Sequence, residues 1–234
     1  MAVTRYKLAE QTLIRLHEAG LLPHFVLIGS WAVYYYSYYF NNRAYLPSIR
    51  TRDMDLLVPV PPPRVSNPID VPDILAGLGF VTGFRGEQGY MILQHSELMI
   101  EFLVPERGRG LSKPFDLPAF GVNAQPLRYL DMLLEDTVVV HVRSLALRLP
   151  HPARFALHKL IVAGRRRSKA KMEKDRNEAR KVLAALKSSG KWRSVVDCLR
   201  SLPPKWRRVI AGQADMADLK EITALVEKEE GVEK

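Results

Sequence analysis

The run Asp53-Met54-Asp55-Leu-Leu-Val58 is the most informative segment of the sequence for the fold. It begins with alternating polar and apolar residues and stops at Pro59, which is the pattern of a β-strand. On a strand, Asp53 and Asp55 point to one face and Met54 to the other. Two neighbouring carboxylates repel each other, and a cation between them relieves the repulsion. The sequence therefore predicts a sheet that carries an acidic cation site.

A second short pattern precedes this strand. Phe25-Val-Leu-Ile28 is an uninterrupted apolar run, as expected of a strand buried on both faces. Gly29 and Ser30 follow, and a helix-like pattern begins at Trp31. A glycine lets the backbone approach a phosphate closely, and the start of a helix offers N–H groups to it. Gly29 and Ser30 are therefore candidate nucleotide-binding residues.

Glu101 is the candidate third carboxylate. A strand is expected over residues 98–104. On it, Ile100 and Phe102 would face the core of the protein, and Glu101 would point to the opposite side. Hard oxygen ligands of this kind suit Mg²⁺, which takes one or two carboxylates together with substrate phosphate oxygens. Asp53, Asp55 and Glu101 are thus the predicted metal ligands and catalytic residues. Taken singly, each also reads as an ordinary turn, cap or exposed strand residue.

Three segments of the chain resemble the motifs of the DNA polymerase β-type nucleotidyltransferase superfamily: Ile28-Gly29-Ser30, Thr51-Arg-Asp-Met-Asp-Leu56 and Ile100-Glu101-Phe102. Within it the chain is most similar to small prokaryotic nucleotidyltransferases, and more distantly to nucleotidyltransferase toxins of the abortive-infection type. The distant likeness depends on Ala156-Leu-His-Lys159-Leu and on a later Lys174-Asp175 pair.

The resemblance implies an enzyme that moves a nucleoside monophosphate from an NTP to a hydroxyl acceptor and releases pyrophosphate. It implies two Mg²⁺ ions held by the three carboxylates, with Glu101 also a candidate base. Gly29 and Ser30 would hold the triphosphate, and Lys159, Lys174 and Asp175 would complete the nucleotide site. The alternatives are a solvated helix lysine at Lys159 and a structural ion pair between Lys174 and Asp175.

The interval from Ser30 to Asp53 departs from the superfamily pattern. It holds 22 residues, which is longer than usual, and it is rich in tyrosine from Tyr34 to Tyr45. Aromatic faces stack on nucleobases without sequence preference. At helical spacing, however, Trp31, Tyr35 and Tyr38 favour packing in the core.

The expected fold class is mixed α/β. A nucleotidyltransferase-type sheet flanked by helices is predicted for residues 1–150, and an all-helical, basic domain for residues 151–234. The expected helices cover residues 5–19, 31–36, 72–78, 126–134, 152–165, 169–187, 192–202 and 216–228, and the expected strands 25–28, 53–58, 80–84, 90–94, 98–104, 137–142 and 144–149. Residues 105–119 are expected to form a loop.

The net charge of +10 belongs to the second of these halves. Residues 1–150 hold 14 basic and 14 acidic residues, whereas residues 154–208 hold 18 basic and 4 acidic ones. The basic helices are therefore expected to hold phosphate, and Arg165–Lys171 is either a nucleic-acid contact or a solvated helix end. An apolar run long enough to cross a membrane is absent from the sequence, and one cysteine fits a reducing cytoplasm.

Two functions stay open at the level of sequence. The first is the Mg²⁺-dependent enzyme with an NTP as substrate, whose acceptor is a tRNA or other nucleic acid, a protein side chain or a small molecule. The second is a catalytically silent protein of the same fold that acts as a basic nucleic-acid-binding module or a toxin–antitoxin partner. The local excess of basic residues favours the second, and the ordered carboxylates favour the first.

Overall fold

The computed structural model describes residues 4–41, 45, 51–106, 108 and 113–232. The chain divides into two compact units, each of which is described by itself. The first holds the described residues up to Tyr39 and those from Thr51 to Pro150. The second begins with Phe40, Asn41 and Tyr45 and continues from His151 to the C-terminal end.

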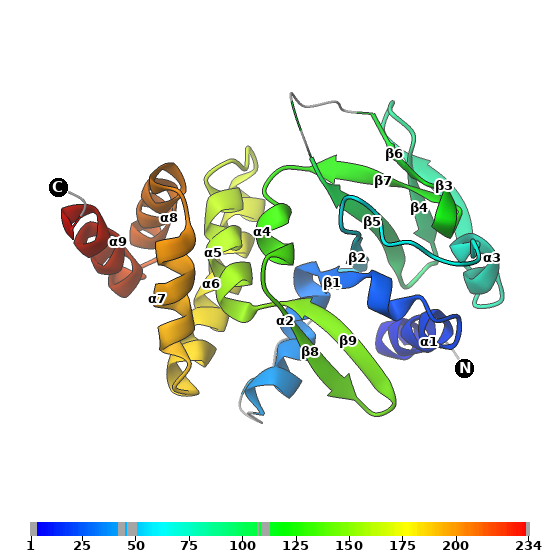
Figure 1. Cartoon of the computed structure of the whole chain (residues 1–234), viewed down its shortest axis with the longest axis horizontal. Coiled ribbons are helices and arrows are strands. Elements are labelled where there is room, and N and C mark those ends of the chain that lie inside the picture. The colour runs from blue at the N-terminus through cyan, green and yellow to red at the C-terminus, as the bar shows by residue number, and fades with distance from the viewer. Residues whose placement is uncertain (1–3, 42–44, 46–50, 107, 109–112, 233–234) are drawn as a thin grey trace. The chain divides into compact units, whose positions relative to one another are not determined.

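The first unit is built on a mixed sheet (Figure 1). Its strands are β1 (Val26–Ile28), β2 (Asp53–Leu57), β3 (Val81–Arg85), β4 (Tyr90–Gln94), β5 (Met99–Pro105), β6 (Phe115–Leu117) and β7 (Val122–Leu127). The main order is β1-β2-β5-β4-β3, and β7 joins β5 to β6. Strand β2 runs parallel to β5 and antiparallel to β1, so two chain segments far apart in sequence lie side by side.

Alternation along β2 and β5 gives this sheet one apolar face. Met54, Ile100 and Phe102 are almost completely buried on it, as the strand pattern predicts. The ring centroids of Phe102 and Phe25 are 6.0 Å apart, and those of Phe25 and Phe120 are 5.1 Å apart. Burial of this face holds the strands in register, because a slip of one residue would expose the whole set.

The opposite face is polar at one end and apolar at the other. Its apolar end packs in a small core with Leu130 and Leu133, around the short helix α4 (Asp131–Leu134). Its polar end carries Asp53, Asp55 and Glu101 at the start of the same strands. The three carboxylates thus lie on the part of this face that does not belong to the small core around α4.

Helices and a hairpin complete the first unit. They are α1 (Arg5–Glu18), α2 (Gly29–Phe40, whose last residue belongs to the second unit), α3 (Val71–Ala76), the 3₁₀ turns η1 (Leu22–His24) and η2 (Pro118–Phe120), and the hairpin of β8 (Thr137–Val142) with β9 (Leu145–Pro150). Thr4 caps α1, and Gly20, at φ +71°, follows it. Tyr36 Oη donates to the Pro150 carbonyl at 2.9 Å, which ties α2 to the hairpin.

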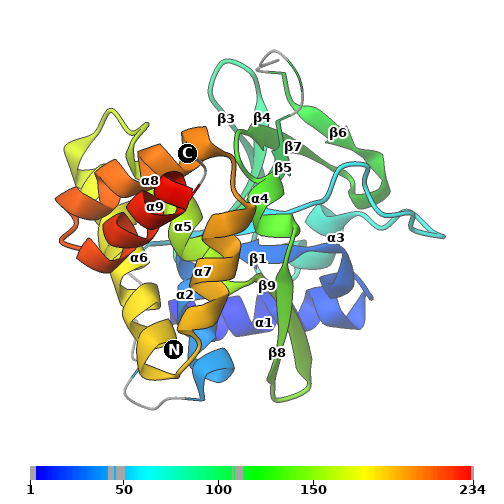
Figure 2. The same ribbon diagram turned by 60° about the vertical axis from the view of Figure 1, so that its left-hand side comes forward.

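The second unit is helical (Figure 2). Its helices are α5 (Pro152–Ala163), α6 (Lys169–Ser188), α7 (Trp192–Ser201), α8 (Pro204–Met216) and α9 (Lys220–Val232). Proline begins α5 and α8, where its missing N–H costs nothing. In the part of the chain that the structure describes, no helix has both the length and the apolar character that a bilayer crossing requires.

The mixed α/β fold is confirmed, and two segments differ from the sequence prediction. The first lies between residues 115 and 134: residues 115–117, expected in a loop, form strand β6, and residues 126–127, expected to begin a helix, belong to strand β7. The helix is limited to Asp131–Leu134. Pairing with β5 decides this, because β7 finds a sheet edge that the local pattern cannot show. The second difference is α8, which occupies residues 204–216 and ends where a single later helix was expected to begin.

Candidate active site

Asp55 and Glu101 are direct neighbours across two parallel strands. In the register of β2 and β5, Asp53 is opposite Met99 and Asp55 is opposite Glu101. Residues that face each other in a sheet present their side chains on the same side. The three predicted carboxylates therefore share one face, and Glu101 points to the same side of the sheet as the two aspartates.

Gly29 lies directly against one of these carboxylates. Its φ is +66°, a left-handed conformation that glycine adopts without strain. A Cβ built on Gly29 would stand 2.1 Å from Oδ2 of Asp55. This contact follows from the pairing of Ile28 with Asp55 across β1 and β2. The Gly29 turn and the acidic strand are therefore in direct contact, which leaves no room for a side chain at position 29.

Asp53 is held by the residue that precedes the strand. Thr51 Oγ1 donates to Asp53 Oδ2 at 2.9 Å and accepts from the Asp53 N–H at 3.1 Å. Arg52, between them, donates to the Ser96 carbonyl at 2.6 Å. The pattern Thr51-Arg52-Asp53 thus orients the first aspartate and anchors the strand.

An arginine that the sequence analysis did not select contacts the third carboxylate. Arg85 Nη1, at the end of β3, lies 2.5 Å from Glu101 Oε1, and the two side chains are 44% and 12% exposed. Strand β4 lies between β3 and β5, so Arg85 reaches across it. Only the sheet order brings these residues together, since 15 positions separate them in the sequence. The one available signal was the basic residue at the end of a predicted hairpin strand.

The donor set fits a divalent cation such as Mg²⁺. It offers hard carboxylate oxygens on one face, and Asp55 is packed against a turn without a side chain. As the side chains stand, the described residues include no group of three acidic, histidine or cysteine ligands gathered closely enough to hold a metal. The guanidinium of Arg85 supplies the countercharge at Glu101 instead. A cation that uses Glu101 has to compete with Arg85.

The other predicted nucleotide-binding residues lie in the helical unit, where they are ion-paired. Lys159 Nζ is 2.8 Å from Asp175 Oδ1 and 2.7 Å from Glu178 Oε2. Arg166 Nε is 2.8 Å from Asp175 Oδ2. Lys174 contacts Glu178 at 4.0 Å, so the paired residues are Lys159 and Asp175 rather than Lys174 and Asp175.

The pKa values agree with a buried ion network. Burial alone would raise the pKa of Asp175, but Lys159 and Arg166 hold it below its usual range. Burial would likewise lower the pKa of Lys159, and Glu178 and Asp175 raise it instead. Both groups are therefore charged at neutral pH, and each depends on the other.

Lys159→Met is expected to destabilise the protein by about 3–5 kcal/mol, because it leaves Asp175 buried with one cation fewer. Urea unfolding measures this. Lys174→Met is the matched control and should cost less than about 1 kcal/mol, since Lys174 is half-exposed. If Lys159→Met raises the KM for NTP and leaves stability unchanged, Lys159 is a phosphate contact rather than part of a structural pair.

His158, next to Lys159 on α5, is buried, and both its ring nitrogens lack a hydrogen-bond partner among the described residues. Burial, followed by the charge of Lys159, lowers its pKa from 6.5 to about 3. In the unfolded chain, His158 therefore binds a proton as the pH falls below 6.5, whereas in the folded chain it stays neutral until about pH 3. The contribution of neutral, buried His158 to the unfolding free energy is therefore fully present above pH 6.5 and is lost as the pH falls towards 3.

Between pH 7 and pH 5, His158 is expected to cost the wild type about 2 kcal/mol of unfolding free energy. His158→Leu should remove that share of the pH dependence, as measured by urea unfolding at both pH values. The same replacement at exposed His141 is the control. An unchanged pH slope in His158→Leu would contradict the assignment.

Several basic side chains of the helical unit are used in contacts within that unit. Arg176 donates twice to Gln213 Oε1, and Arg180 donates twice to the Ala217 carbonyl at the end of α8. Arg193 pairs with Asp197, and Arg200 with Glu229. The excess of basic residues in the sequence is therefore explained in part by contacts within the helical unit, and not by affinity for phosphate alone.

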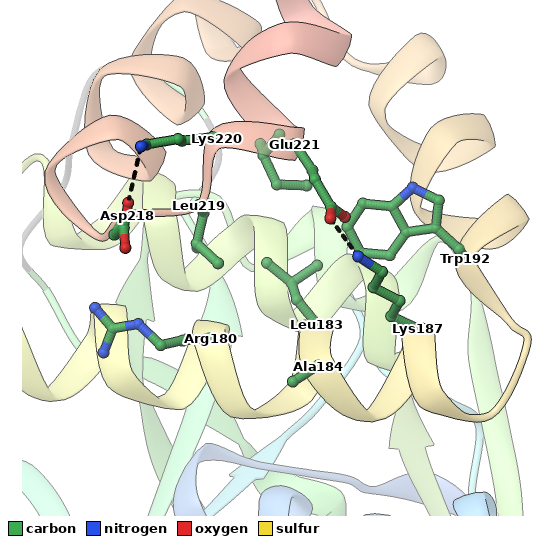
Figure 3. A pocket seen from close by; sticks show the side chains of 10 residues that line it. Arg180, Leu183, Ala184, Lys187, Trp192, Asp218, Leu219, Lys220 and Glu221 are labelled. Carbon is green, nitrogen blue, oxygen red and sulfur yellow. Dashed lines mark hydrogen bonds and ion pairs between the residues drawn. The ribbon is translucent and has the colours of Figure 1, made fainter.

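A pocket of about 370 Å³ lies between α6, the start of α7 and the α8–α9 connection (Figure 3). Leu183 and Leu219 face each other across it, and Trp192 stands beside it. Its rim charges are paired, Lys187 with Glu221 and Lys220 with Asp218. This pocket lies in the helical unit and contains none of the predicted site residues.

The tyrosine-rich interval is described up to Asn41 and at Tyr45, and the rest lies outside the described residues. Trp31 and Tyr35 are buried, as the helical spacing predicts. Tyr38 is 50% exposed, contrary to the expectation that it packs in the core, because α2 turns this residue to solvent. Burial, above all, raises the pKa of Tyr35 and Tyr45 far beyond their usual range.

Comparison with known proteins defines the class. A family model described as nucleotidyltransferase matches residues 8–202, which is most of the chain. The chain therefore belongs to this nucleotidyltransferase family. The predicted nucleotidyltransferase family and the predicted enzyme class are confirmed. Among curated proteins, no significant match is found.

Two solved structures are similar in fold. One is the crystal structure of ANT(2")-Ia in complex with adenylyl-2"-tobramycin, at 12% identity and a TM-score of 0.44, which covers 80% of this chain and 93% of that one. The other is an antigenic nucleotidyltransferase-like protein from Paracoccidioides brasiliensis, at 10% identity and a TM-score of 0.42, which covers 89% and 94%.

Proposed function

We propose that this nucleotidyltransferase moves a nucleoside monophosphate from an NTP to a hydroxyl acceptor in a Mg²⁺-dependent reaction at Gly29, Ser30, Asp53, Asp55 and Glu101. The observation that carries the proposal is the contact between the turn and the acidic strand. Gly29 has no space for a Cβ because Asp55 occupies it, and Asp55 is in register with Glu101. The backbone proposed to bind phosphate therefore lies beside the proposed metal ligands.

Gly29 and Ser30 form the nucleotide end of the proposed site. They begin α2, a helix of 12 residues whose first turn directs its N–H groups along the helix axis and carries the positive end of the helix dipole. Both features favour the phosphates of an NTP. The contributions of Lys159, Lys174 and Asp175 stay a prediction, which the Lys159 and Lys174 variants test.

Asp53, Asp55 and Glu101 would hold the metal, which supplies charge neutralisation for the phosphates and makes the acceptor hydroxyl more acidic. The acceptor oxygen attacks the α-phosphorus in line, and the bond from that phosphorus to the β-phosphate oxygen breaks, so that pyrophosphate leaves. We assign the acceptor proton to the carboxylate of Glu101. Thr51 keeps Asp53 oriented throughout, because its hydroxyl donates to that carboxylate.

The direct test is pyrophosphate release from each of the four NTPs with a panel of acceptors that includes tRNA, proteins and small alcohols. Activity should disappear with a chelator and return with Mg²⁺ or Mn²⁺. The panel also identifies the acceptor. If the protein is inactive with every NTP and acceptor, yet binds nucleic acid without NTP, the catalytically silent module or toxin–antitoxin partner becomes the better description.

Cys198, a lone buried thiol, is consistent with work in a reducing prokaryotic cytoplasm.

Removing the Arg85 side chain charge is expected to tighten metal binding. Arg85→Gln abolishes the ion pair with Glu101, so a cation no longer competes with a guanidinium for that carboxylate. The Kd for Mn²⁺, measured by electron paramagnetic resonance without NTP, should fall about 3- to 10-fold, in line with about 1 kcal/mol for a partly exposed ion pair.

Arg128→Gln is the matched control for this measurement. Arg128 also pairs with a glutamate of low exposure, Glu106, at 3.3 Å in the same unit, so the variant removes the same charge. Its Mn²⁺ affinity should stay at the wild-type value. Weaker Mn²⁺ binding in Arg85→Gln would show that Arg85 positions Glu101 for the metal rather than competing with it.

A further inference from the structure

A second pocket, of about 210 Å³, lies in the first unit and is distinct from the carboxylate site. It is formed by α1, α2 and the tip of the β8–β9 hairpin. Five aromatic side chains line it: Tyr6, Trp31, Tyr34, Tyr35 and Tyr38. We call it the aromatic pocket. None of the residues assigned to catalysis or to the triphosphate contributes to it.

The rings form a contiguous cluster with an open side. Trp31 is 6.0 Å from both Tyr6 and Tyr34, and Tyr34 is 5.0 Å from Tyr35. Trp31 and Tyr35 are buried and form the closed side. Tyr6 and Tyr38, in contrast, are 43% and 50% exposed. Exposed phenol rings beside a hollow lined with aromatic groups leave planar surface available to a flat ligand.

The charged residues of the pocket favour an anionic ligand. Lys7 of α1 and Arg143 of the hairpin supply two cations, and Glu10 supplies one carboxylate, which Arg143 already pairs. Arg143 adopts φ +54° at the turn of the hairpin, a left-handed conformation that is uncommon for a non-glycine residue. This net positive lining would repel a cationic ligand and attract a phosphate.

Flat stacking surface together with cations is the combination that binds nucleic acid bases and their backbone. The helix α2 also links this pocket to the proposed site, since it begins at Gly29 and carries Tyr34 and Tyr38 one and two turns later. Tyr38 is about 12 Å from Ser30 along the helix axis, at 1.5 Å per residue. This distance is of the order of two nucleotides of an extended strand.

We propose that the aromatic pocket binds a nucleotide unit of a single-stranded nucleic acid, and that such a strand is the acceptor. Bases would stack on the exposed rings of Tyr38 and Tyr6, and the adjoining phosphate would contact Lys7 and Arg143. The acceptor role rests on the proposed function, whereas binding itself does not. Duplex nucleic acid should bind weakly, because its bases are already stacked on one another.

The test is fluorescence anisotropy of a labelled 12-nucleotide single-stranded RNA, with a chelator and without NTP. Tyr38→Ala and Tyr6→Ala should each weaken binding about 5- to 150-fold, the effect of losing one stacked base. Tyr38→Phe should retain binding. Phe84→Ala is the matched control, since Phe84 is a 63% exposed aromatic residue on β3 that does not line the pocket. Arg143→Gln should reduce the salt dependence by about one phosphate contact.

The outcomes separate the sources of binding. Equal loss in Phe84→Ala and Tyr38→Ala, equal affinity for a duplex, or full competition by AMP at the strand's own concentration would each overturn the proposal. So would binding that survives the double Tyr6→Ala/Tyr38→Ala variant, which would place the strand on the basic helices. If the strand binds as expected but no NTP yields pyrophosphate, the proposed function fails and the binding site stands.

Discussion

Asp55→Asn is expected to lower the rate of nucleotidyl transfer at least about 10³-fold, which corresponds to about 4 kcal/mol of transition-state stabilisation. Asp55 is the carboxylate that touches the Gly29 turn and is also in register with Glu101. Asparagine keeps the shape of the side chain but loses the charge that a divalent cation requires. Pyrophosphate release at saturating NTP and Mg²⁺ measures the loss.

Stability should not follow activity in this variant. Removing one of two neighbouring carboxylates relieves repulsion, so the unfolding free energy should be unchanged or slightly higher. Asp116→Asn is the control, because Asp116 is an exposed aspartate on a strand of the same sheet. It should be fully active. Retained activity in Asp55→Asn would remove Asp55 from the site, and a large drop in stability would make its role structural.

The strands that carry the site could be predicted because their side chains alternate. Met54, Ile100 and Phe102 are buried as the pattern required, so Asp53, Asp55 and Glu101 face the other way. Burial of an apolar face is a local property of each strand. It determines the side of every residue without knowledge of the neighbouring strand.

Sheet order and long-range pairing could not be predicted. Arg85 reaches Glu101 only because β4 lies between their strands, and the pattern of a hairpin does not say which strand joins it next. The same reason accounts for β7, whose Val122–Leu127 segment becomes a strand by pairing with β5. In the helical unit, Lys159 and Asp175 come together through helix packing, so two residues predicted for the nucleotide site are ion-pair partners in the fold.

Gly29→Ala is expected to combine two costs that separate cleanly. The first is the left-handed backbone, at φ +66°, which costs an alanine roughly 1–2 kcal/mol of stability. The second is the Cβ itself, which would lie 2.1 Å from Oδ2 of Asp55 and must push that carboxylate away. We expect at least a 100-fold loss of transfer together with the loss of stability, measured by pyrophosphate release and by urea unfolding.

Gly20→Ala is the matched control, because it introduces the strain of a left-handed backbone without a contact between the Cβ and a carboxylate. Gly20 has nearly the same backbone, at φ +71°, but a Cβ there meets no atom within 4 Å. It should lose a similar 1–2 kcal/mol of stability and keep its activity per folded molecule. The difference in activity between the two variants then reports the displacement of Asp55 alone. If both lose stability equally and both remain active, the turn at Gly29 is a structural element, and the contact with Asp55 has no part in the reaction.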